Sequence, residues 1–166
     1  MTASVRRALL SIALLSFVAL GIALVSQHIA GMRPCAWCVL QRLILLLTGS
    51  SALLGWDLVH PGGLKALPAS IIAALVTGTL SVSGIIAAWY QYSVAALQFS
   101  CAQTFADRFM TGLGLDAMVP WLFGIYATCM DARVDLLGIE YALWGLGLFV
   151  VLTGVSAFAL IQATRR

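Results

Sequence analysis

The stretch from Ala8 to Gln27 reads ALLSIALLSFVALGIALVSQ and contains no charged residue. A helix of about 20 apolar residues is long enough to cross the hydrocarbon core of a bilayer, which is about 30 Å thick. Three further apolar stretches follow along the chain, at about 39–56, 68–90 and 141–162. The sequence therefore predicts four transmembrane helices.

The composition excludes a water-soluble globular domain. Of the 166 residues, 62% are hydrophobic and only 9% are charged, and the mean hydropathy is +1.04. Soluble domains are about half apolar and about a quarter charged, so most of this apolar surface must face lipid. We expect an all-α membrane protein, a four-transmembrane-helix bundle that forms one membrane domain over residues 1–166.

The first apolar stretch also has features of a signal peptide, because Arg6 and Arg7 precede it. It is longer than the usual apolar core of such a peptide, about 7 to 15 residues, and no convincing A-x-A cleavage site follows it. We therefore expect this segment to remain as the first transmembrane helix.

The charged residues predict the orientation, since Lys and Arg near helix ends stay on the cytoplasmic side. One side of the predicted bundle holds five basic residues and one acidic residue, namely Arg6, Arg7, Lys65, Arg165, Arg166 and Asp57. The other side holds four basic and five acidic residues, namely Arg33, Arg42, Arg108, Arg133, Asp107, Asp116, Asp131, Asp135 and Glu140. We expect both termini to be cytoplasmic, with outer loops at about 28–38 and 91–140.

The second outer loop contains a segment, Phe105 to Tyr126, that is more apolar than an exposed loop. Gly112, Gly114 and Pro120 interrupt it, so it makes a poor transmembrane helix. A short interfacial helix in the headgroup layer explains this pattern. Alternatively, these side chains pack on the ends of the transmembrane helices.

All four cysteines, Cys35, Cys38, Cys101 and Cys129, fall on the non-cytoplasmic side, where disulfides persist. Cys35 and Cys38 form a C-x-x-C motif at the start of the second helix, and a helix amino terminus stabilises a thiolate. A static disulfide is less favoured, because closing so short a loop constrains the unfolded chain very little. A zinc site is also less favoured, because the other two cysteines are 28 positions apart and do not form a second C-x-x-C. We expect redox-active thiols and no metal.

Arg42 stands one helical turn after Cys38, on the same face of the helix. An arginine inside a transmembrane segment is energetically costly and is a functional candidate. It could stabilise the Cys38 thiolate and donate a hydrogen bond to a bound electron acceptor, or it could extend towards lipid phosphates. Cys101 and Cys129 either tie the long loop or take part in a thiol relay, and their spacing does not decide between these roles.

Several motifs together resemble the DsbB family of disulfide bond formation proteins. They are the P-C-x-x-C motif ending at Cys38, the following Gln41-Arg42, the pair Val119-Pro120 before the fourth cysteine, and the run DLLGIE at 135–140. The resemblance implies an enzyme of the bacterial inner membrane that reoxidises a periplasmic DsbA-like thiol oxidase. Its electrons would pass to membrane quinone, either ubiquinone or menaquinone.

The resemblance also implies a role for each cysteine. Cys35 and Cys38 would form the quinone-facing pair, with Cys38 in contact with the quinone. Cys101 would accept attack from the soluble oxidase, and Cys129 would exchange with Cys35. Arg42 would match the family's quinone-site arginine.

The sequence departs from the family pattern near the outer end of the third helix. The family often has a histidine there, where this chain has Trp89-Tyr90-Gln91-Tyr92. Gln91 could still donate a hydrogen bond to a quinone oxygen, but it cannot titrate near neutral pH. We expect it to be a quinone contact on weaker grounds than Arg42.

Two other functions remain open from the sequence. One is a quinone-linked thiol enzyme similar to the vitamin K epoxide reductases, which has the opposite net direction of electron flow. The other is a structural four-helix membrane protein whose outer loops are held together by disulfides.

Overall fold

The computed structural model describes residues 2–59, 66–97 and 104–164, so Lys65 and Cys101 lie outside the described residues. Its four long helices are α1 (Thr2–His28), α2 (Ala36–Leu58), α3 (Ala66–Ser93) and α7 (Tyr141–Thr164). All four are long and apolar enough to cross a membrane. The predicted four-helix membrane fold is therefore confirmed.

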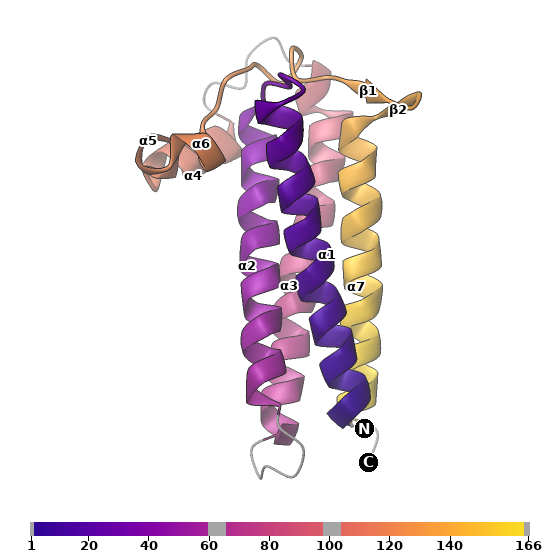
Figure 1. The fold of residues 1–166 in the computed structure, drawn as a ribbon. Coiled ribbons are helices and arrows are strands. Elements are labelled where there is room, and N and C mark those ends of the chain that lie inside the picture. Colours follow the sequence, from indigo (N-terminus) through magenta and orange to yellow (C-terminus); the bar gives the residue numbers. More distant parts are fainter. Residues whose placement is uncertain (1, 60–65, 98–103, 165–166) are drawn as a thin grey trace.

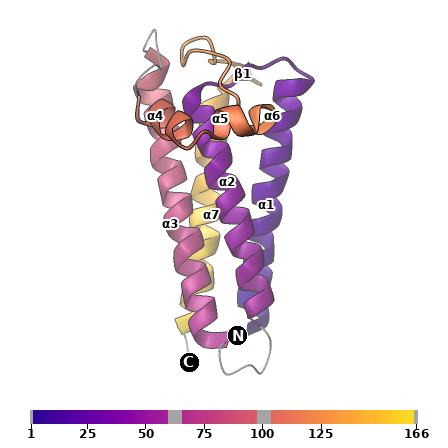
Figure 2. The same cartoon turned by 90° about the vertical axis from the view of Figure 1, so that its left-hand side faces the viewer.

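The long helices form a ring in which each packs against two others: α1 on α2, α2 on α3, α3 on α7 and α7 on α1. Figures 1 and 2 show them running side by side along the whole bundle. Helix α1 begins and α7 ends at the same end of the bundle (Figure 1). The start of α2, where the C-x-x-C motif lies, is at the opposite end.

Small residues and interhelical hydrogen bonds hold the bundle together, as in other membrane proteins. On α3, a Cβ at Gly84 would lie 2.2 Å from the Phe149 ring of α7, so these helices approach closely only because this position is glycine. The Ser156 hydroxyl donates to the Thr77 hydroxyl across the same pair of helices, at 3.2 Å. Outward-facing apolar side chains on all four long helices remain exposed, as lipid contact requires; they include Val18, Leu54, Ile86 and Val150.

The apolar part of the long loop folds as three short helices, α4 (Phe105–Gly112), α5 (Leu115–Met118) and α6 (Pro120–Phe123), and not as one. Thr104 caps α4 by accepting from the Asp107 backbone N–H. The chain then breaks at Gly114, whose φ is +67°, and α6 begins at Pro120, a favourable first helical position. The three helices lie across the bundle near its cysteine end, where α4 and α6 pack against α2 and α5 packs against α4 and α6 (Figures 1 and 2). Their placement in the headgroup layer stays a prediction.

The remaining elements are small. A 3₁₀ turn, Ala95–Leu97, follows α3. A hairpin, not predicted from the sequence, pairs β1 (Asp135–Leu136) with β2 (Ile139–Glu140) immediately before α7. Its two turn residues, Leu137 and Gly138, both have positive φ, which matches the type I′ turns that join short antiparallel strands.

Candidate redox site

The C-x-x-C motif forms the first turn of α2. Cys35 is the N-cap residue, in an extended conformation, and Cys38 is the third helical residue. Their sulfur atoms lie 3.2 Å apart and are hydrogen-bonded as free thiols, a separation that requires only a small movement to form a disulfide. The motif is therefore a dithiol poised for oxidation.

The two sulfur atoms have different surroundings. Cys35 is fully buried, and its hydrogen bond with Cys38, together with burial, raises the pKa of the Cys35 thiol well above its ordinary value. Either sulfur could be the donor in this contact, and the raised pKa of Cys35 favours Cys35 as the donor to Cys38. The Cys38 sulfur also accepts a hydrogen bond of 3.1 Å from Gln91 Nε2. Both contacts and the start of the helix favour negative charge on Cys38.

Arg42 extends away from lipid and into the protein, and it is only 5% exposed. Its guanidinium donates to the Gln27 side-chain oxygen and the Ala23 carbonyl on α1, and to the Leu122 carbonyl on α6. The alternative of an arginine extending to lipid phosphates therefore does not hold. All three acceptors are neutral, and among the described residues no carboxylate forms an ion pair with Arg42, so its positive charge favours negative charge on Cys38.

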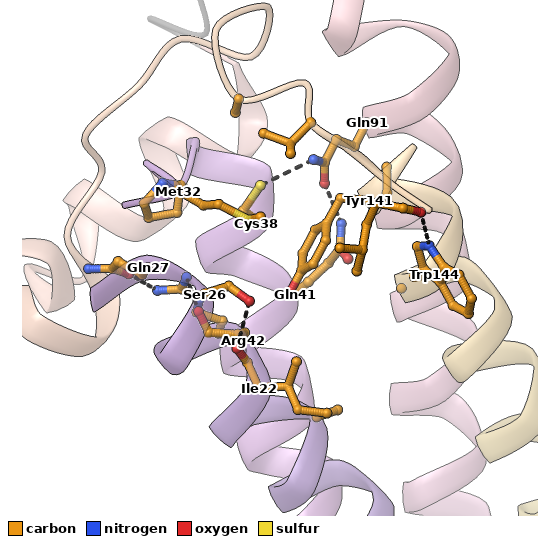
Figure 3. Close-up of a pocket in the computed structure, with 18 of the residues that line it drawn as sticks. Ile22, Ser26, Gln27, Met32, Cys38, Gln41, Arg42, Gln91, Tyr141 and Trp144 are labelled. Atoms are coloured by element: carbon orange, nitrogen blue, oxygen red, sulfur yellow. Dashed lines mark hydrogen bonds between the residues drawn. The ribbon is translucent and has the colours of Figure 1, made fainter. Parts of the chain in front are cut away.

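A cavity of about 360 Å³ lies beside Cys38, between the outer halves of the helices (Figure 3). Its walls are mainly apolar, and Cys38, Gln41, Arg42 and Gln91 are among the polar residues that line it. The α7 wall includes Tyr141, Trp144, Gly145 and Leu148. The structure thus brings Cys38, Arg42 and Gln91 together at one cavity.

Loop segments line part of this cavity. Leu136 of the hairpin lines it, and the Leu136 carbonyl accepts a hydrogen bond from the Trp144 indole N–H, at 3.2 Å. An ion pair of 3.1 Å between Arg133 and Glu140 fastens the base of the hairpin. The hairpin therefore forms part of the cavity wall and is held against α7.

Cys129 lies in the irregular segment between α6 and β1 and is 2% exposed. It is disulfide-bonded, and Cys101 is not among the described residues. The Tyr126 backbone N–H donates to the Pro34 carbonyl, at 3.0 Å, which ties this segment to the residue before Cys35. The two cysteine regions are thus adjacent in the fold.

Two residues at the site, Gln27 and Gly145, were not singled out from the sequence, and Gln41 was noted there only as part of a motif, without a role. Gln27 accepts from Arg42, Gln41 donates to Gln91, and Gly145 lies against Gln41. The two glutamines carried a usable signal, because polar side chains inside transmembrane segments usually face the interior and have a partner. Nothing in the sequence pointed to Gly145.

Known proteins that are similar to this chain in sequence point to one family. The family model for disulfide bond formation protein DsbB matches residues 5–159. A disulfide bond formation protein B from Ralstonia nicotianae is 30% identical over 168 residues, which cover 100% of both chains. The protein of that name from Escherichia coli K12 is 28% identical over 154 residues, covering 90% of this chain and 84% of the relative. The chain belongs to the DsbB family.

Proposed function

We propose that this protein is a thiol:quinone oxidoreductase that reoxidises a periplasmic DsbA-like dithiol oxidase and passes the electrons to membrane quinone. Membership of the DsbB family supports its role as a disulfide-forming oxidoreductase. The observation that carries the proposal is the Cys38 sulfur, which lies at the wall of an apolar cavity beside Arg42 and Gln91. Such a cavity suits a lipid-soluble electron acceptor.

The residues around the cavity fit a quinone, a flat apolar ring with two carbonyl oxygens. Three of the five N–H groups of Arg42 donate to protein acceptors, and the described part of the chain gives the other two no acceptor. These groups could bind a carbonyl oxygen in the cavity. Gln91 also lines the cavity, and we retain it as a second quinone-site residue.

A quinone, when bound, supplies a two-electron acceptor that takes up two protons. The chain's own residues supply the dithiol: Cys35 and Cys38 become a disulfide and release two electrons and two protons. Gln91 and Arg42 stabilise the Cys38 thiolate before this step, since each provides an N–H donor or a positive charge close to the sulfur.

In our proposal the outer pair connects this dithiol to the soluble partner. A thiolate of the reduced DsbA-like protein attacks Cys101, and its second thiol resolves the mixed disulfide. The Cys35–Cys38 disulfide then oxidises the reduced Cys101–Cys129 pair by exchange and itself becomes the dithiol. A DsbA-like oxidant lies near −120 mV and ordinary structural disulfides lie below about −300 mV. The outer pair must therefore be much more oxidising than a structural disulfide.

We also propose that the termini are cytoplasmic and the cysteines periplasmic. Arg6 and Arg7, near the start of α1, lie at the bundle end opposite the cysteines, as a positive cytoplasmic face requires. Single cysteines can test this in a chain that lacks its own: an impermeant thiol reagent applied to intact spheroplasts should label Asp135→Cys and not Asp57→Cys. Labelling of Asp57→Cys alone would reverse the topology.

The direct test of the proposed function is quinone reduction by the purified protein in detergent, followed by absorbance. Reduced DsbA-like protein should drive the reaction, and Cys38→Ser should abolish it. Quinol-dependent reduction of an oxidised partner without the forward reaction would favour the opposite net direction. No exchange of electrons with quinone at all would refute the proposal.

A further inference from the structure

Two glutamine side chains form a hydrogen-bonded chain that ends on the Cys38 sulfur. Gln41 Nε2, on α2, donates to Gln91 Oε1, on α3, at 2.6 Å. Gln91 Nε2 in turn donates to Cys38 Sγ, at 3.1 Å. Figure 3 shows this chain of contacts at the wall of the cavity.

The orientation of the Gln91 amide matters because its two ends have opposite character. A thiolate only accepts hydrogen bonds, so the NH₂ end stabilises it and the oxygen end would repel it. The two orientations are similar in shape, and the amide adopts the one that its other neighbour supports. Gln41 presents an N–H to the oxygen of Gln91, and that contact directs the Gln91 NH₂ group to Cys38.

The position of Gln41 depends in turn on α7. A Cβ at Gly145 would lie 2.9 Å from Gln41 Oε1, closer than side-chain atoms normally approach. Two residues further along the same helix, a Cβ at Gly147 would meet nothing within 4 Å. The absence of a side chain at position 145 therefore leaves the space in which the Gln41 amide lies.

We infer that Gln41 is a positioning residue, which acts through Gln91 to direct an N–H donor at the Cys38 sulfur, and that Gly145 provides the space it needs. The inference rests on the proposed function only in taking Cys38 as the working thiolate. Gln41 on α2, Gln91 on α3 and Gly145 on α7 thus each influence how readily the Cys35–Cys38 dithiol is oxidised.

The equilibrium between this dithiol and glutathione tests the inference without quinone. It can be measured on the full-length protein in detergent, with Cys101 and Cys129 both changed to serine. Loss of a hydrogen bond to the thiolate destabilises the reduced form, so the disulfide becomes a weaker oxidant. We expect Gln41→Ala and Gln91→Ala each to shift the equilibrium constant towards the disulfide roughly tenfold, which is about 30 mV.

The double variant separates positioning from a direct effect. If Gln41 acts through Gln91, Gln41→Ala should cause no further shift in a Gln91→Ala background.

Gly145→Ala should shift the equilibrium in the same direction by a few-fold, because the flexible Gln41 amide moves before the backbone does. The matched control Gly147→Ala should leave the equilibrium unchanged. An unchanged equilibrium in Gln41→Ala, or a full shift that persists without Gln91, would overturn the inference. Because no quinone is present, failure of the proposed quinone reaction would leave these results unaffected.

Discussion

Cys35 and Cys129 are both buried, but the regions around them are built differently. Cys35 and Cys38 form the first turn of a long helix. Helix α3 donates a hydrogen bond to Cys38, and α1 and α6 accept hydrogen bonds from Arg42, one turn later. Cys129 lies in an irregular segment whose nearby turn is closed by local contacts, such as the 2.7 Å hydrogen bond from the Thr128 hydroxyl to Asp131. The burial of Cys35 and Cys129 therefore does not distinguish the two regions, whereas their local structure does.

This difference fits the division of labour between the two pairs in our proposal. A sulfur that transfers electrons to an acceptor in a cavity needs a fixed position, and a helix start with contacts from several elements supplies it. A cysteine that exchanges partners needs a segment that can rearrange at low cost, and segments with few long-range contacts do so most readily. We expect substitutions in the first region to affect acceptor use and substitutions in the second to affect partner exchange.

The largest expected effect in the second region comes from Cys129→Ser. In our proposal Cys101 is then a free thiol that can attack an oxidised DsbA-like protein, and without Cys129 the adduct can be released only by reversal through the partner's own second thiol. Turnover should fall below detection, and a covalent adduct should appear on a non-reducing gel. An adduct that forms through Cys35 would contradict the proposed order of electron flow.

Arg42→Ala should give the next largest effect, confined to the first region. A buried hydrogen bond from a charged donor contributes about 1.5–3 kcal/mol, so we expect the KM for quinone to rise roughly tenfold or more. Exchange between the partner and the outer pair should change much less. Arg108→Ala, on the exposed face of α4, is the matched control and should leave the KM unchanged. Equal losses in both half-reactions would indicate that Arg42 only supports the fold.

Arg133→Ala should have the smallest effect. Its ion pair with Glu140 fastens the hairpin, but the Arg133 side chain is 47% exposed, and such pairs usually contribute less than about 1 kcal/mol. Thermal unfolding in detergent should therefore shift only slightly, and the KM for quinone should stay within about twofold. A large rise in the KM would mean that the hairpin controls access to the cavity.

The sequence was sufficient for the four-helix fold because long apolar stretches are a strong and local signal. It was weaker at helix ends, where hydropathy assigned Gln91 to the outer loop, whereas α3 continues to Ser93. That difference matters, since a helical Gln91 faces Cys38. The Gln41–Gln91 contact joins residues 50 positions apart, and the hairpin turn depends on the backbone conformation of Leu137 and Gly138. Neither follows from local composition.

The central claim, that electrons reach quinone only through Cys38, can be tested by counting electrons. Oxidised wild-type protein without quinone should oxidise two equivalents of reduced DsbA-like partner, and oxidised Cys38→Ser should oxidise only one. Added quinone should start continuous turnover in the wild type and have no effect on Cys38→Ser. Continued turnover of Cys38→Ser with quinone would contradict the account.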